Sequence, residues 1–184
     1  TDPALRLANP RLWWPNGYGD PALYTLTLTA AAEGQPSDTR SLRFGVRELS
    51  YELALFGSDG RLNRVEVDPT DARPGELPLI DVRHQAIKQT PLGWAQSLTP
   101  AGEKSPAVRP VPPSTQLPHL TLRVNGVRIA ARGGNWGMDD AMKRFGRAEL
   151  EPYFRLEREA HMNVIRNWMG TNTELAFYDL ADEN

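Results

Sequence analysis

The sequence has 184 residues, of which 40% are hydrophobic and 24% are charged, a composition typical of a globular protein with a sizeable core. Its formal charge of −2 argues against a nucleic acid or an anionic membrane surface as partner. The absence of cysteine excludes a disulfide framework, thiolate zinc ligands and a cysteine nucleophile, and leaves the cellular compartment open.

The first 68 residues carry the pattern of β-strands. From Leu23 to Ala30 bulky apolar residues alternate with threonine, which is typical of a strand with one buried face. The preceding run WWPNGYGDP is rich in proline, asparagine and glycine and predicts an ordered loop. The runs SLRFGVREL and SYELALF predict further strands, and residues 57–60 predict a hairpin turn. We therefore expect residues 1–68 to be all-β.

Residues 69–118 form a proline-rich segment. It holds ten of the 16 prolines and shows little periodicity. Proline removes a backbone donor and resists both helices and central strands. We expect this segment to be a long connection, either disordered or held against neighbouring domains.

From residue 119 the pattern changes to alternating strands and helices. Residues 124–127 predict a hairpin, followed by a short apolar strand, the helix-forming run AELEPYFRLEREAHM, the β-branched run NVIRNW and a last helix in ELAFYDLADEN. Thr171 and Glu174 have the spacing of a capping box for this last helix. The order predicts successive βα units of a parallel sheet. A (β/α)₈ barrel needs about 250 residues. Only 66 remain in residues 119–184, so we expect an incomplete barrel with at most two units.

Polar and aromatic side chains gather where these two strands end. They are Asn135, Trp136, Asp139, Asp140, Arg166, Asn167 and Trp168. In βα barrels this end of the strands carries the active site. Amide, carboxylate and guanidinium groups suit sugar hydroxyls, and indole suits the apolar face of a sugar ring, which predicts a carbohydrate ligand. The alternative is that both tryptophans are core residues and the charged groups form structural pairs.

Other mechanisms find no support in the sequence. It has no nucleophile elbow, phosphate loop, dinucleotide fingerprint or paired-histidine zinc motif, and its three histidines are far apart. We expect no metal and no cofactor.

Four runs in order along the chain resemble glycoside hydrolase family 2. LWWPNGYGDPALY and FGVREL resemble the immunoglobulin-like β-sandwich that precedes the catalytic barrel of this family. VNGVRIAARGGNWGMDDAMKR resembles its first barrel strand, and HMNVIRNWMGTNTELAFYDLADEN its second strand and helix. The GGNW and R-x-W-x-G runs are similar to those of β-mannosidases, with the mannosylglycoprotein endo-β-mannosidase branch nearest.

The resemblance implies a fold and a reaction. Residues 1–68 would be the C-terminal part of an immunoglobulin-like β-sandwich, residues 69–118 the connection, and residues 119–184 the start of a TIM-barrel catalytic domain. The family hydrolyses β-glycosides with retention through two glutamates about 5–5.5 Å apart. Both belong to later barrel strands, so we expect the fragment alone to be inactive, to need the remaining domains of its parent chain, and to require no cofactor.

The resemblance also implies roles for individual residues. Asn135, Trp136 and Asp140 would line the −1 sugar subsite, and Arg166 would orient the nucleophilic carboxylate. Asn167 and Trp168 occupy the family's strand-end positions, where Trp168 would contact substrate; the alternative is that both face the next helix. Asp139 has weaker support. The expected partner is a carbohydrate, a β-mannoside or related β-glycoside, with a periplasmic or secreted location favoured.

Two alternatives stay open. The first is an exo-β-glucosaminidase or a β-galactosidase-like member of the same family, because most groups around the sugar C2 lie outside this sequence. The second is a non-catalytic carbohydrate-binding β-sandwich module.

Overall fold

The computed structural model describes residues 6–32, 35–72, 78–112, 119–137, 142, 144–168 and 174–184. Most regular structure in these residues is β-strand, which fits a β-sandwich protein with few helices. Contacts divide the chain into two compact units. Unit 1 comprises residues 1–47 and 131–184, and unit 2 comprises residues 48–130. Within the described residues no helix is long and apolar enough to cross a membrane.

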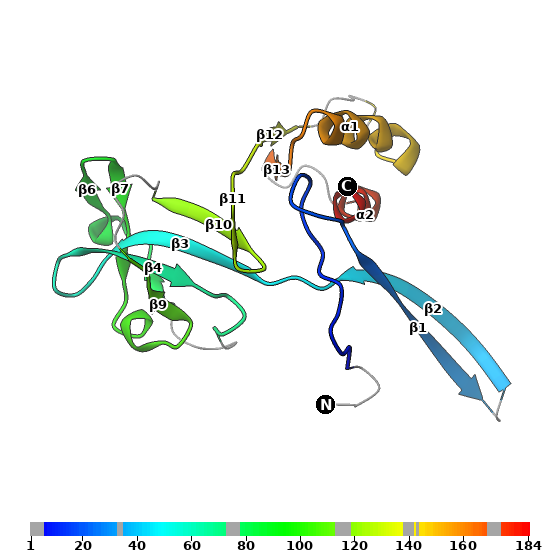
Figure 1. Cartoon of the computed structure of the whole chain (residues 1–184), viewed down its shortest axis with the longest axis horizontal. Coiled ribbons are helices and arrows are strands. Elements are labelled where there is room, and N and C mark those ends of the chain that lie inside the picture. Colours follow the sequence, from blue (N-terminus) through cyan, green and yellow to red (C-terminus); the bar gives the residue numbers. More distant parts are fainter. Residues whose placement is uncertain are drawn as a thin grey trace. The chain divides into compact units, whose positions relative to one another are not determined.

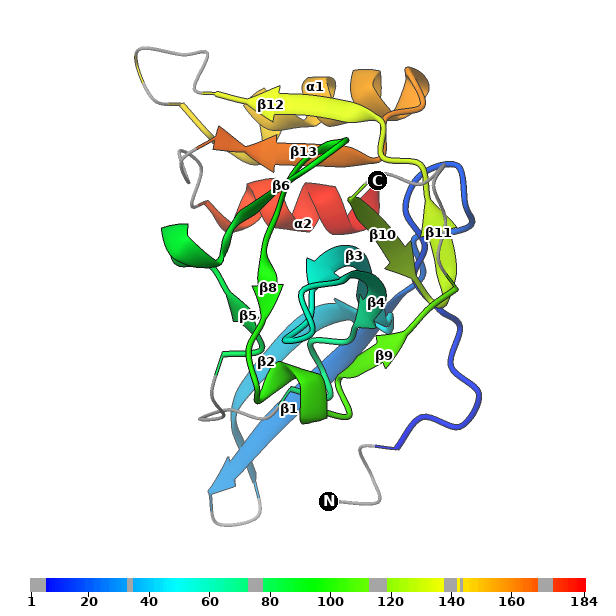
Figure 2. The ribbon, with the colours of Figure 1, turned by 90° about the vertical axis from the view of Figure 1, so that its left-hand side faces the viewer.

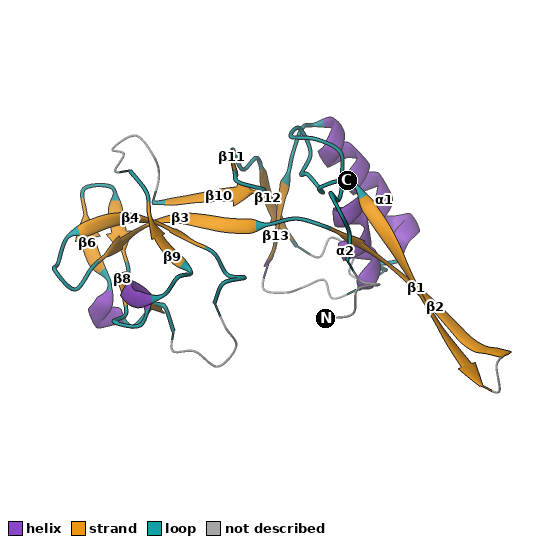
Figure 3. Cartoon of the chain, turned by 60° about the horizontal axis from the view of Figure 1, so that its bottom comes forward, coloured by secondary structure: helices purple, strands orange, loops and turns teal. Residues whose placement is uncertain are grey.

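Unit 1 begins with the predicted loop and strand. β1 (Leu23–Ala32) pairs antiparallel with β2 (Gln35–Gly45), and the two form a long hairpin (Figures 1 and 3). The apolar face expected on β1 is partly open to solvent, since Leu28 is 53% exposed, and Leu42 on β2 is 48% exposed. In the part of the chain that the structure describes, β1 and β2 form a two-stranded sheet, and a hairpin without further strands buries little apolar surface.

The second part of unit 1 has the predicted order of strand, helix, strand and helix. β12 (Gly133–Trp136) is followed by α1 (Arg147–Glu159), and β13 (Val164–Asn167) by α2 (Leu175–Glu183). The two strands pair in parallel, and Figure 2 shows them running alongside each other. The expected capping box begins at Thr171, which lies outside the described residues.

An apolar cluster joins this parallel pair to its helices. Its buried members are Trp136, Leu150, Phe154, Phe177 and Leu180. They come from β12, α1 and α2, so burial of one continuous apolar surface holds the two helices against the strands.

Unit 2 is built on a seven-stranded sheet. The main path runs β11-β10-β3-β4-β9, and β8 joins β3 to β5. The strands are β3 (Leu49–Phe56), β4 (Leu62–Val67), β5 (Ile80–Asp81), β8 (Ser97–Leu98), β9 (Val108–Pro110), β10 (Leu120–Val124) and β11 (Val127–Ile129). β6 (Lys88–Thr90) and β7 (Gly93–Ala95) form a separate hairpin, and two short 3₁₀ turns cover His84–Ala86 and Gly102–Lys104.

Both predicted hairpins of unit 2 are confirmed. Residues 57–60 join β3 to β4, and the backbone N–H of Gly57 donates to the carbonyl of Arg61 at 2.9 Å. Asn125 and Gly126 join β10 to β11 with φ of 50° and 77°, the positive values that a two-residue type I′ turn requires.

The sequence predicts that the proline-rich segment is a long connection, either disordered or held against neighbouring domains, and its described part contains regular structure. Its described part, residues 78–112, contributes five short strands, three of which belong to the main sheet. Proline is tolerated there because of its position: Pro110 lies in β9, at the end of the strand order. The expected domain boundaries after residues 68 and 118 stay a prediction, since the contacts group residues 48–130 together.

Candidate functional site

The carboxyl ends of β12 and β13 meet at one edge because the strands are parallel. Asn135 stands opposite Arg166 in the register, and Arg166 Nη1 donates to Asn135 Oδ1 at 3.0 Å. Both side chains are exposed. The guanidinium carbon of Arg166 lies 5.3 Å from the ring centroid of Trp168, which is 45% exposed. The structure therefore brings together an amide, a guanidinium and an indole from the predicted set.

Trp136 lies on the other face of the same strand pair. Its indole is buried and packs edge-on against Tyr153 at 5.3 Å between ring centroids, and against Phe177 at 5.8 Å. Its partner in the register, Asn167, donates to the hydroxyl of Tyr178 at 3.3 Å. Successive side chains of a strand point to opposite faces, so Trp136 and Asn167 face the helices while Asn135 and Arg166 do not.

This placement changes the predicted constellation. In the described residues Trp136 and Arg166 do not share a hollow. Trp136 is instead a core residue, as the alternative interpretation of the sequence expects. Its Nε1 has no hydrogen-bond partner among the described residues. Asp139 and Asp140 lie outside the described residues, so their expected roles stay predictions.

A hollow of about 210 Å³ lies between α1, β13 and α2. Its lining includes Glu157, Asn167 and Tyr178, so it belongs to the helix side of β13 and not to the Arg166 face. Burial raises the pKa of Glu157 above its ordinary value. Among the residues that the structure describes, no group of three or more His, Asp or Glu side chains could hold a metal ion.

Close backbone contact fixes the start of the strand pair. The N–H of Asn163 donates to the carbonyl of Arg132 at 2.8 Å, and Asn163 Oδ1 accepts from the N–H of Arg132 at 2.9 Å. At Gly133, a Cβ atom would lie 1.7 Å from the carbonyl oxygen of Val164. The glycine pair before Asn135 is the trace that this close approach leaves in the sequence.

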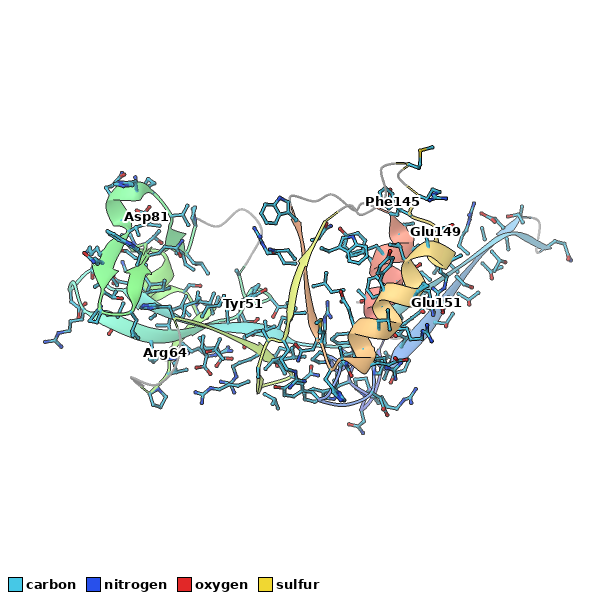
Figure 4. The ribbon with its side chains drawn as sticks, turned by 90° about the horizontal axis from the view of Figure 1, so that it is seen from above. Tyr51, Arg64, Asp81, Phe145, Glu149 and Glu151 are labelled. Carbon is cyan, nitrogen blue, oxygen red and sulfur yellow. The ribbon has the colours of Figure 1, made fainter. Side chains whose placement is uncertain are left out.

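A second cluster, in unit 2, was not predicted at all. Glu52 is fully buried and accepts from Arg64 Nε at 3.1 Å and Arg128 Nε at 2.7 Å, with Arg123 Nη1 at 3.3 Å. Glu52 and Arg64 alternate with apolar residues along β3 and β4, and Figure 4 shows Arg64 and Tyr51 on opposite faces of this sheet. The carboxylate and its arginines satisfy one another, which is the pattern of a structural ion network.

Residues 1–47 match the model of the family described as Glycosyl hydrolases family 2. A mannosylglycoprotein endo-β-mannosidase of Lilium longiflorum is 24% identical over 99% of this chain, which spans 13% of its length. An exo-β-D-glucosaminidase of Amycolatopsis orientalis is 40% identical over 41% of the chain and 7% of its own length. A β-mannosidase B of Aspergillus terreus is 43% identical over 24% of the chain and 5% of its own length. No solved structure matches the chain.

Proposed function

We propose that this chain, which belongs to glycoside hydrolase family 2 and is of the mannosidase type, is part of a retaining hydrolase that cleaves β-mannosidic bonds in oligosaccharides or glycans. The observation that carries the proposal is the likeness to the lily endo-β-mannosidase over nearly the whole chain. The chain spans 13% of the length of that relative. As part of the proposal, we assign the two catalytic glutamates to later barrel strands, outside residues 1–184.

The parallel strands support the barrel part of the proposal. β12 and β13 are parallel neighbours, each followed by a helix, which is the arrangement of the first two units of a (β/α)₈ barrel. In such a barrel the helices lie outside, so the Asn135 and Arg166 face would line the interior. The active site of these barrels lies at the carboxyl ends of the strands, where both side chains stand.

The chemistry of this face suits a sugar. Asn135 and Arg166 offer donors to hydroxyl groups and to a carboxylate, and the exposed indole of Trp168 offers an apolar surface to a ring face. We assign Arg166 the role of orienting the nucleophilic glutamate. Trp136 supports the site indirectly, because its packing in the apolar cluster holds β12 against α1 and α2. Asp140 remains a proposed sugar contact.

The second candidate is an exo-β-glucosaminidase. It is favoured by the 40% identity to the Amycolatopsis enzyme over 75 residues. Sugar preference depends on contacts around C2, and the mannoside and the glucosaminide differ there.

The first test is substrate preference. The full-length protein should hydrolyse nitrophenyl β-mannoside faster than the β-glucosaminide or β-galactoside, measured as kcat/KM. NMR of the first product should show the β-anomer, because a retaining mechanism passes through two inversions. Faster turnover of the glucosaminide would replace the mannosidase assignment, and a protein that binds sugars without hydrolysing any would be a carbohydrate-binding module.

Arg166 provides the second test. Arg166→Lys in the full-length protein should lower kcat about tenfold while KM changes little, because lysine keeps the charge but loses the planar fork that can hold an amide and a carboxylate together. Arg155→Lys is the matched control on the exposed surface of α1, and it should leave both constants unchanged. Equal kinetics for the two variants would remove Arg166 from the site.

A further inference from the structure

The loop of residues 13–19, within the segment that matches the family model, contacts the end of helix α1. The amide nitrogen of Asn16 donates two hydrogen bonds, to the carbonyl of Arg158 at 2.9 Å and to that of Met162 at 3.0 Å. A carboxamide has two N–H donors, so Asn16 uses both on this one turn. The turn joins α1 to β13.

The same turn is fixed by its own geometry and by a second side chain. His161 has a φ of 59°, its N–H donates to Arg158, and the N–H of Met162 donates to Glu157, which together form a Schellman motif. Arg132 Nε donates to the carbonyl of His161 at 2.8 Å. The carbonyls of residues 158, 161 and 162 therefore all accept from side chains outside the helix.

The loop also contacts the end of α2. Trp13 Nε1 donates to the carbonyl of Asp182 at 2.6 Å, and the next residue, Glu183, pairs with both Arg43 and Arg147. Gly45 makes room for the indole, because a Cβ there would lie 2.9 Å from Trp13 Cβ. One loop thus contacts the last turns of both helices that support the strand pair.

We propose that the loop of residues 13–19 is a positioning element for the Arg166 site, with Asn16 setting the register in which β13 meets β12. This rests on the proposed function for its consequence in catalysis. Met162 is four residues before Arg166, and a shift of β13 by one residue would turn Arg166 to the helix side and leave Asn135 without this partner. Two hydrogen bonds to the turn that starts β13 oppose such a shift.

Hydrogen exchange in the full-length protein tests the positioning without a measurement of activity. Asn16→Ala should speed exchange of the amides of Asn163 and Val164, which donate to Arg132, by about tenfold. Asn16→Asp should speed it further, because a carboxylate would face two carbonyl oxygens at the negative end of α1. Asn63→Ala is the matched control, since it removes one local bond to Arg61 in unit 2. Unchanged exchange, or an equal rise in the control, would overturn the proposal.

A double-mutant cycle in the full-length protein tests the route through Arg166. Asn16→Ala should lower kcat several-fold in the native background and less than about twofold in the Arg166→Lys background. The reason is that Asn16 acts by positioning the guanidinium group of Arg166, which the lysine variant lacks. If the decreases in kcat caused by Asn16→Ala and Arg166→Lys multiply fully in the double variant, Asn16 has a general structural role and the positioning proposal is wrong. If the protein hydrolyses no glycoside the proposed function fails, whereas the exchange measurement still decides whether Asn16 fixes the turn.

Discussion

Gly133→Ala should destabilise unit 1 by about 3 kcal/mol or more, whereas the same substitution at Gly134 should be tolerated. At Gly133 an added Cβ would lie 1.7 Å from the carbonyl oxygen of Val164 and 2.8 Å from its carbonyl carbon. Both atoms are backbone, so no side chain can move aside, and the strands must separate. At Gly134 nothing lies within 4 Å of the added atom.

The two variants form a matched pair. Each adds one methyl group to adjacent strand positions, so differences in intrinsic strand preference largely cancel. Urea unfolding followed by tryptophan fluorescence reports on this layer, because the buried Trp136 belongs to it. Equal urea midpoints of unfolding for the two variants would mean that β12 and β13 do not approach each other as closely at Gly133 and Val164 as the structure indicates.

The consequence for the site follows from the register. Gly133 opposes Val164, and two residues further Asn135 opposes Arg166. Separating the strands at their first pair therefore disturbs the hydrogen bond between Arg166 and Asn135. In the full-length protein Gly133→Ala should lose activity along with stability, whereas Gly134→Ala should retain both.

Local turn chemistry was well predicted from the sequence. Asn125-Gly126 and the glycine-rich run at residues 57–60 both adopt the expected hairpins, because a tight turn depends on which adjacent residues accept positive φ. The alternation of strands and helices was predicted from residue 119, and in the described residues it begins at β12, because β10 and β11 belong to the sheet of unit 2. The helices could be predicted since each carries its own periodic apolar face.

The faces of β12 could be predicted only in part. The period of two already places the side chains of Asn135 and Trp136 on opposite sides of the strand, which conflicts with the expectation that both line one sugar subsite. Which side of β12 meets the helices depends on Phe154 and Phe177, which lie 18 and 41 residues after Trp136 in the sequence. That choice is made by tertiary packing, so the strand alone does not reveal it.

The strands of the proline-rich segment could not be predicted from the sequence. These strands are two or three residues long, too short for a period of two to be visible. β8 and β9 receive their hydrogen bonds from the longer strands β3 and β4, whereas β5 pairs with β8, and β6 and β7 pair with each other. Sequence reasoning finds strands by their own pattern and misses those that neighbouring strands induce.

Glu52→Gln should destabilise unit 2 by about 3 kcal/mol at neutral pH. The carboxylate is fully buried, and the side chain of its partner Arg64 is 5% exposed. Removing one member of such a pair leaves the other charge buried and uncompensated, which costs about 3–5 kcal/mol. The lower end applies because Arg128 is 51% exposed and solvent screens it.

The control for this variant is Glu48→Gln, at an exposed position directly before β3. It makes the same change of charge without removing a buried partner, so it should shift stability by less than about 0.5 kcal/mol. Thermal or urea unfolding of both variants would measure the difference. Similar losses at residues 48 and 52 would mean that net charge, and not the buried network, determines stability.

The pH dependence separates the network from a simple loss of packing. Burial alone would raise the pKa of Glu52, but hydrogen bonds from Arg128 and Arg64 and the attraction of their charges outweigh it and hold the pKa below its ordinary value. A lowered pKa in the folded state means that the unfolded chain binds the proton more readily. The contribution of Glu52 is therefore complete above the ordinary pKa of glutamate, about 4.3, and is lost as the pH falls through the lower folded value.

Glutamine at position 52 does not titrate, so the stability gap between the native chain and Glu52→Gln should be constant from neutral pH down to about pH 5 and should narrow below about pH 4. Asp68, whose pKa is lowered chiefly by a hydrogen bond from the Thr70 side chain, loses stability over a similar range in both chains and cancels from the difference. A gap of the same size at pH 3 and pH 7 would show that glutamine fails through shape, and that the buried carboxylate does not stabilise unit 2 through its charge.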